Sequence, residues 1–252
     1  MSKIGRLMAA SILASLALTA VAADMGKTLR ITFQVAETGF DPVKIHDYYS
    51  GTVIEAVYDT LLTYDYLARP AKLVPRAAAL PEVTDGGRTW TFKLKKGILF
   101  TSDPAFKGKR RELVAEDFEY TIKRFLDPKN RSPYAFFFEG KVLGLDALAD
   151  EAKEKGKFDY DRKIPGFELP DSHTLRIKLK EPDFALGQIL AFAETSVVAR
   201  EVIEMYGDES NFHPVGTGPY MLDKYVRSSK IFLKANPDFR KEIWDFKAGH
   251  DP

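Results

Sequence analysis

The segment HPVGTGPYML, residues 213–222, places two glycines and a proline around one threonine. A glycine-rich loop can present backbone N–H groups to a phosphate when a strand precedes the loop and a helix follows it. Here the sequence predicts the opposite context, because a helix over 197–207 precedes the segment and paired strands follow it. We therefore expect Gly216, Gly218 and Pro219 to turn the chain, with the glycines adopting backbone angles closed to other residues.

Residues that could support hydrolysis or bind a metal ion are few. The four histidines, His46, His173, His213 and His250, form no H-x-x-x-H or H-E-x-x-H pattern, so no metal site is predicted. Ser172 precedes His173, but adjacency does not build a catalytic triad, and the chain has no G-x-S-x-G elbow. We interpret this pair as turn residues ahead of a strand, and we expect no catalytic residue and no cofactor.

The charged residues are balanced and indicate solvated surface. The formal net charge is +1, which gives no strongly basic face for nucleic acid. The basic run FKGKRRE, residues 106–112, is interpreted as a solvated loop rather than a polyanion site. Asp159 and Asp161 lack the remaining residues of a calcium-binding loop, so solvation is the better interpretation there as well.

The first residues predict export. Lys3 and Arg6 precede an apolar run over 7–22 that is rich in small residues and ends in an A-x-A-like cleavage pattern. We interpret residues 1–23 as a cleavable signal peptide, because the run is shorter than the roughly 20 apolar residues that a membrane span needs. The chain has no cysteine, which excludes a lipid anchor on cysteine and disulfides, so a bacterial periplasmic protein is predicted.

Periodicity predicts a mixed α/β fold. Apolar residues at four-residue spacing predict a helix over 50–64, capped by Ser50 or Thr52, and the helical pattern recurs over 114–128 and 197–207. Alternation predicts a strand over 89–95, in a hairpin with the preceding AALPEV. The remaining patterns predict strands over 28–36, 173–182 and 229–237, and a loop over 158–170.

Three stretches, taken together, resemble one protein family. Residues 214–240, PVGTGPYMLDKY…IFLKANPDFR, are similar to a segment shared by the family 5 extracellular solute-binding proteins, the peptide-binding receptors of bacterial ABC importers. Residues 57–100 resemble that family's helix, loop and hairpin, and residues 114–135 resemble the helix that follows. The three stretches occur in the family's order along nearly all of the predicted mature chain.

The resemblance implies an α/β clamp of the periplasmic-binding-protein type, with two lobes and an extra inserted domain. By this likeness, residues 24–58 and 200–252 belong to the first lobe, and residues 59–199 form the inserted domain. The chain stops abruptly at Pro252, and family members continue for a similar length. We therefore expect only the N-terminal portion of the clamp, truncated before the second lobe.

The resemblance also implies a function and candidate contacts. Members of the family capture a peptide between the lobes and deliver it to a membrane-embedded ABC transporter permease, and we expect a monomer that binds no nucleic acid. By the family's pattern, the ligand contacts in this half fall at His46, Asp47 and Tyr48, at Tyr134 and at Phe192. The carboxylate that pairs with a peptide's amino terminus belongs to the half of the family that this chain does not include.

Alternatives remain open at this point. Tyr134 and Phe192 could be core residues, and His46 could be a plain loop residue standing where the family has an acidic one. The segment TSDPAFKGKRREL, residues 101–113, departs from the family's short turn, which leaves contacts at the edge of the lobe open. The same scaffold could bind haem, a nickel complex or an oligosaccharide, the chain could be a secreted hydrolase, or the truncated chain could bind nothing alone.

Overall fold

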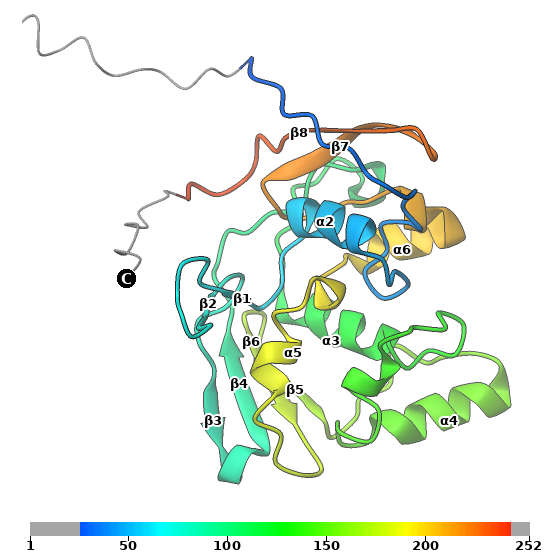
Figure 1. Cartoon of the computed structure of the whole chain (residues 1–252). Coiled ribbons are helices and arrows are strands. Elements are labelled where there is room, and N and C mark those ends of the chain that lie inside the picture. The colour runs from blue at the N-terminus through cyan, green and yellow to red at the C-terminus, as the bar shows by residue number, and fades with distance from the viewer. Residues whose placement is uncertain (1–25, 243–252) are drawn as a thin grey trace, which may run out of the picture. The chain divides into compact units, whose positions relative to one another are not determined.

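The computed structural model describes residues 26–242 and divides the chain into one unit that ends at Gln34 and another that begins at Val35 (Figure 1). The signal peptide predicted over 1–23 lies outside the described residues, as does His250. Within residues 26–242, no helix combines the length and apolar character that a membrane crossing requires.

The strand predicted over 28–36 is wrong. These residues form no strand, and Leu29, Ile31 and Val35 expose 80%, 66% and 61% of their surface. A strand needs a neighbour to pair with its N–H and C=O groups, and none of the strands in the described chain pairs with this segment. The β-branched residues therefore favour extended backbone locally, but a strand forms only where a partner strand is present.

An antiparallel sheet of four strands, in the order β3-β4-β6-β5, organises the larger unit. Its strands are β3 (Glu82–Thr84), β4 (Thr89–Lys93), β5 (Phe167–Asp171) and β6 (Thr174–Lys178). The structure confirms the strands predicted at 89–95 and 173–182. It also confirms the hairpin predicted ahead of the strand at 89–95, which is formed by β3 and β4. The loop predicted over 158–170 is wrong at its end, because β5 begins there and pairs with β6, burying Phe167.

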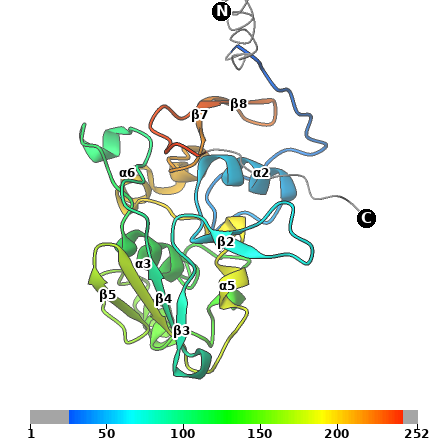
Figure 2. The same ribbon diagram turned by 90° about the vertical axis from the view of Figure 1, so that its left-hand side faces the viewer.

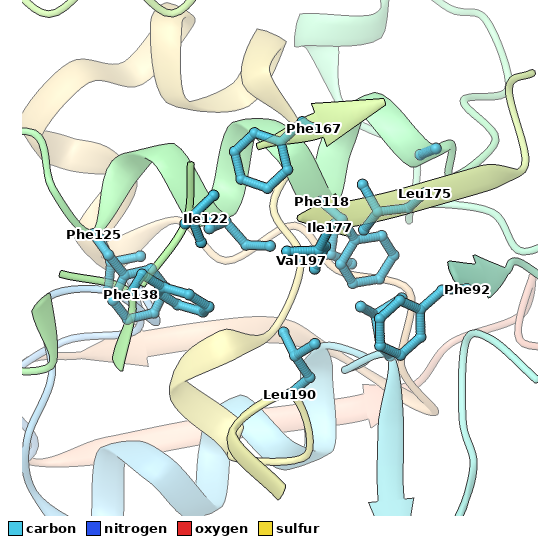
Figure 3. Packing of buried hydrophobic residues seen from close by; sticks show 14 of the residues in the cluster. Phe92, Phe118, Ile122, Phe125, Phe138, Phe167, Leu175, Ile177, Leu190 and Val197 are labelled. Carbon is cyan, nitrogen blue, oxygen red and sulfur yellow. The ribbon is translucent and has the colours of Figure 1, made fainter. Parts of the chain in front are cut away.

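The core lies between this sheet and α3 (Ala115–Arg124), the helix predicted over 114–128. Phe92 and Leu175 face each other across β4 and β6, and both are fully buried. Figure 3 shows these side chains packing with Phe118 and Ile122 of α3. The period-2 pattern of the strands and the helical pattern of α3 thus produce one shared apolar layer.

Helix α2 (Tyr48–Val57) is shorter than the helix predicted over 50–64. Its N-cap is Asp47, not Ser50 or Thr52, and Asp47 accepts a hydrogen bond from the Ser50 backbone N–H. After Val57 the chain becomes extended and forms β1 (Leu62–Tyr64), which pairs with β2 (Leu73–Pro75). Leu61 and Leu62 are both buried. They fit the apolar spacing of the predicted helix, although they lie in the extended chain that follows α2.

The last elements lie at the opposite end of the unit from the four-stranded sheet. Helix α6 (Arg200–Tyr206) ends at Gly207, whose φ of 54° is positive, a conformation that glycine adopts more readily than other residues. The predicted hairpin is confirmed as β7 (Tyr220–Val226) and β8 (Lys230–Ala235). Figures 1 and 2 both place this hairpin beside α2, which contacts β7. The remaining elements are α4 (Leu145–Lys155), α5 (Leu186–Ile189) and the 3-10 helices η1 (Asp85–Gly87), η2 (Pro104–Phe106), η3 (Ala135–Phe137), η4 (Ala193–Thr195) and η5 (Gly207–Phe212).

Gly216, Gly218 and Pro219 turn the chain into the hairpin, but the physical reason predicted for the glycines is wrong. Neither glycine has a positive φ. Instead, a Cβ atom on Gly216 would lie 2.0 Å from the carbonyl oxygen of Val57, and one on Gly218 would lie 2.7 Å from the Val57 carbonyl carbon. The glycines therefore permit close approach to the end of α2, where the Gly218 N–H donates to the Val57 carbonyl at 2.8 Å.

Candidate functional site

The loop that leads into α2 positions the first group of predicted contacts. Asp47 accepts hydrogen bonds from the Ser50 N–H at 2.8 Å and from the Thr38 hydroxyl at 2.5 Å. Partial burial opposes ionisation, yet these hydrogen bonds hold the pKa of Asp47 below its ordinary value. Asp47 is therefore a charged helix cap with both oxygens engaged. His46 and Tyr48 on either side are exposed, Tyr48 by 81%.

The second group of predicted contacts joins an aromatic cluster. Tyr134 stacks on Phe137 with ring centroids 5.2 Å apart, and the Phe192 ring lies 5.6 Å from that of Phe137. Phe136 meets Phe137 edge to face at 4.8 Å. Phe137 is buried, whereas Phe136 and Phe192 expose 59% and 47% of their surface. We call Tyr134, Phe136, Phe137 and Phe192 the aromatic shelf.

Short 3-10 helices fix the shelf in place. Tyr134 is the N-cap of η3 and Phe192 is the N-cap of η4, so both rings project from the start of a tight turn. Phe137 at the end of η3 belongs to the buried core, with its ring 6.4 Å from that of Phe125 in the residues after α3. The shelf is thus the exposed edge of the core rather than a loose surface patch.

Electrostatics links one residue of the first group to the second group. Burial raises the pKa of the Tyr134 hydroxyl, and the charge of Glu194, a hydrogen bond with the Glu194 side chain and the charge of Asp47 raise it further. Glu194 lies in η4, which packs against α2. Asp47 and Tyr134 are therefore within electrostatic reach of each other, and Phe192 joins Tyr134 through the shelf.

Two acidic residues beside the shelf were missed by the sequence reasoning. Burial raises the pKa of Glu55, and repulsion from Glu194 raises it further. Within the described chain neither glutamate belongs to a salt bridge, and neither does Asp47. The sequence held two weak indications of these residues. Glu55 lies outside the apolar rows of its helix, and Glu194 is two positions after Phe192.

Two buried carboxylates hold the elements behind this surface. Asp41, just ahead of the α2 loop, accepts from the Arg124 guanidinium of α3 at 2.9 and 2.7 Å. Burial opposes ionisation of Asp41, yet the Arg124 charge holds its pKa below the ordinary value. The Asp59 carboxylate accepts hydrogen bonds from Arg76 at 2.5 Å, from Arg240 at 2.7 and 3.0 Å, and from the Thr217 hydroxyl at 2.8 Å. These bonds join segments that are far apart in the sequence.

The other candidate sites have structural explanations. Ser172 Oγ lies 2.9 Å from His173 Nδ1, and His173 Nε2 lies 3.1 Å from Glu112 Oε1. The three side chains meet at the turn between β5 and β6, and Glu112 also accepts from the Gly97 N–H at 2.6 Å. The contacts thus tie down a hairpin turn, in agreement with the interpretation of Ser172 and His173 as turn residues.

Several charges in these loops are paired within the protein. Asp161 pairs with Arg200 at 2.5 Å, and Asp159 lies 3.7 Å from Arg162, as expected for solvated ion pairs. In the basic run 106–112, Arg110 pairs with Asp238 and Arg111 with Asp117. Across residues 26–242, no group of three or more histidine, aspartate or glutamate side chains has the arrangement of a metal site.

Comparisons with known proteins agree on one family. Residues 72–249 match the family described as bacterial extracellular solute-binding proteins, family 5. Di/tripeptide-binding protein 1 of Pseudomonas aeruginosa is 29% identical over 238 residues, which cover 92% of this chain and 41% of that protein. Glutathione-binding protein GsiB of Escherichia coli is 28% identical over 218 residues, which cover 86% of this chain and 36% of that protein.

Solved structures show the same fold. Haemophilus influenzae OppA, in complex with RPPGFSPFR, gives a TM-score of 0.67 at 25% identity and covers 81% of this chain and 37% of that one. The Escherichia coli murein tripeptide binding protein MppA gives a TM-score of 0.66 at 25% identity and covers 82% and 38%. The chain therefore has the mixed α/β fold of these proteins and spans about 40% of the length of its relatives.

Proposed function

Because the chain belongs to the bacterial extracellular solute-binding proteins of family 5, a family of binding proteins rather than enzymes, we propose that it binds peptides for import. In this proposal the protein captures a short peptide in the periplasm and presents it to the permease of an ABC transporter. The predicted signal peptide supports export.

The observation that carries the proposal is the agreement among its relatives. Di/tripeptide-binding proteins 1 and 2 of Pseudomonas aeruginosa are 29% and 30% identical to this chain over 92% and 85% of its length. One of the structures of the same fold holds the peptide RPPGFSPFR, which carries arginine at both ends. A glutathione-binding relative indicates that small peptide-like solutes also belong to the range.

The surface built from Asp47, Tyr134 and Phe192 supports this proposal. An extended peptide can lay its side chains on exposed aromatic rings, which bury large apolar area with few rotatable bonds. We propose that residues 24–58 and 200–252 form part of one lobe and residues 59–199 form an inserted domain, so that the shelf contributes to one wall of a clamp. Closure of such a clamp would exclude water and present one form to the transporter.

Thermal unfolding of the complete gene product tests the ligand class, whether or not that product extends past Pro252. We expect a mixture of di- and tripeptides to raise the melting temperature, because a ligand that binds only the folded state stabilises it. If no peptide raises it while haem, a nickel complex or an oligosaccharide does, the protein uses the same scaffold for a non-peptide solute. Conversion of the peptide to its amino acids, lost in Ser172→Ala, would indicate the hydrolase instead.

The role of the shelf has its own test. Phe192→Ala removes a ring that is half exposed in the free protein, so we expect about 1 kcal/mol of lost peptide binding, or roughly a fivefold weaker Kd. Phe184→Ala is the matched control, because Phe184 is also exposed, by 70%, but is not part of the shelf. Equal peptide affinity of the two variants, measured by isothermal titration, would remove Phe192 from the binding surface.

A further inference from the structure

The turn between β3 and β4 carries the only aspartate in the sequence that is followed by a glycine. Asp85 precedes Gly86 and Gly87 in η1, and Figure 1 places this turn at the end of the sheet that points away from the β7–β8 hairpin. An aspartyl carboxyl group can close a five-membered ring with the next main-chain nitrogen, and a glycine has no Cβ atom to obstruct that approach. Asp85–Gly86 is therefore the pair in this chain that is best suited to such a ring closure.

The structure leaves this pair open. Asp85 and Gly86 are both exposed, and a Cβ atom built on Gly86 would meet nothing within 4 Å beyond its neighbours in the chain. Among the described residues, no hydrogen bond or salt bridge holds the Asp85 carboxylate. Asp85 also has a φ of 51°, in the left-handed region that a residue with a Cβ atom occupies at a cost. Neither contacts nor backbone conformation therefore protect the existing linkage.

The turn between β5 and β6 provides a comparison within the same protein. Asp171 precedes Ser172 there, both are exposed, and the pair can undergo the same ring closure. Both carboxylate oxygens of Asp171 are engaged, because Oδ1 accepts from the His173 N–H at 2.8 Å and Oδ2 accepts from the Thr174 hydroxyl at 2.7 Å. The side chain of Ser172 also stands beside the attacking nitrogen. The two turns thus differ in that one carboxylate is free and the other is fixed.

We propose that Asp85–Gly86 is a modification site, at which the aspartate isomerises spontaneously to isoaspartate. The Gly86 nitrogen attacks Asp85 Cγ, a C–N bond forms, and the amide proton and the carboxyl OH leave as water, which produces a succinimide. Water then opens the ring at one of its two carbonyls. Cleavage of the bond from nitrogen to the main-chain carbonyl carbon of Asp85 leaves the chain linked through Cγ, whereas cleavage at Cγ restores aspartate. The isomerisation needs no oxidant or reductant, changes no mass and does not depend on the proposed peptide binding.

The modification would disturb the packing beside the turn. A main chain that runs through Cγ of Asp85 is longer by one carbon atom ahead of Gly86. The next residue has little room to absorb this change, because the Gly87 carbonyl accepts from the buried indole N–H of Trp90 at 3.0 Å. A Cβ atom on Gly87 would lie 2.9 Å from the Phe184 ring, so that ring closes the other side. We therefore expect the isomerised protein to be less stable.

Ageing of the complete gene product in neutral buffer tests the inference. Trypsin releases Asp85 in a peptide of residues 77–88 and Asp171 in a peptide of residues 164–176. The isoaspartyl form of each peptide has an unchanged mass but separates by chromatography, and fragmentation by electron transfer identifies the linkage through Cγ. We expect the isoaspartyl fraction of peptide 77–88 to grow several times faster than that of peptide 164–176. The melting temperature of the protein should fall as that fraction grows.

Variants connect the two readouts. Asp85→Glu keeps the charge but would need a six-membered ring, so it should abolish isomerisation at this turn and hold the melting temperature constant during ageing. Asp171→Glu is the matched control in the other turn, and peptide 77–88 should age in it as in the wild type. A parallel sample in urea measures the isomerisation of the unfolded chain.

Three results would overturn the inference. The first is an isoaspartyl fraction that grows equally in the two peptides of the folded protein. The second is isoaspartate in peptide 77–88 in urea and none in the folded protein, because the turn would then protect the pair. The third is a melting temperature that falls as much in aged Asp85→Glu as in the aged wild type, which would remove isomerisation as the cause of the loss.

Discussion

At the scale of single residues, buried Asp41 and Arg124 join the loop ahead of α2 to α3. Asp41→Asn would leave the guanidinium buried without its counter-charge, so we expect a loss of about 3–5 kcal/mol in the free energy of unfolding at pH 7. The double variant Asp41→Leu, Arg124→Met removes both charges and should recover most of that loss. Urea unfolding measures both, and a single variant as stable as the wild type would contradict the assigned role.

The same pair predicts a pH dependence. The pKa of Asp41 is lowered in the folded state, so its contribution to stability is present above the pKa of an unfolded aspartate. That contribution is lost as pH falls through the lowered folded pKa. The difference in unfolding free energy between wild type and Asp41→Asn should therefore be large at pH 7 and narrow in strong acid. A difference that does not depend on pH would contradict the assignment.

Glu55 should behave in the opposite sense. Burial and the neighbouring Glu194 raise the pKa of Glu55 in the folded state above that of an unfolded glutamate. The folded state therefore loses stability as the pH rises from the unfolded pKa through the folded pKa, where Glu55 ionises. Glu55→Gln should gain less than about 1 kcal/mol at pH 7.5, because the residue is partly exposed and its charge is screened. The gain should vanish near pH 3, and urea unfolding at both values tests this; a gain that persists at pH 3 would exclude the charge as its cause.

Sequence reasoning found some residues of the candidate site and missed others for physical reasons. Tyr134 and Phe192 were proposed as contacts from the resemblance to the family, and the structure places both in one aromatic cluster with Phe137. Glu55 and Glu194 are separated by a long stretch of chain, so no local pattern could place one beside the other. Asp47 was expected to contact the ligand, but its role as the cap of α2 depends on a hydrogen bond from the Ser50 backbone N–H, which composition cannot show.

At the scale of elements, Gly216 and Gly51 should respond in opposite ways to substitution by alanine. Gly216→Ala would place a Cβ atom 2.0 Å from the Val57 carbonyl oxygen, so the end of α2 must shift, at a cost of about 1–3 kcal/mol. Gly51→Ala in α2 meets nothing within 4 Å, and should stabilise the protein by about 0.5–1 kcal/mol through helix propensity. Melting temperatures that move in the same direction for both variants would contradict this account.

Periodicity predicted the elements better than their ends. The strands around Trp90 and Ile177 were found because alternation matches a sheet with one buried face. The end of α2 was missed because Leu61 and Leu62 are buried in the extended chain that follows and imitate the helical rows. The explanation of Gly216 by backbone angle was wrong because close approach to another segment is a property of the folded chain.

At the scale of the whole molecule, the chain corresponds to a portion of its relatives. It spans about 40% of the length of the relatives it matches.

The measurement that tests the central claim most directly is isothermal titration of the complete gene product with a tripeptide pool, followed by mass spectrometry of the bound fraction. We predict saturable binding of one peptide per protein and recovery of the peptides intact. No heat of binding from peptides, or recovery of the peptides only as free amino acids, would contradict the account of this chain as part of a peptide receptor.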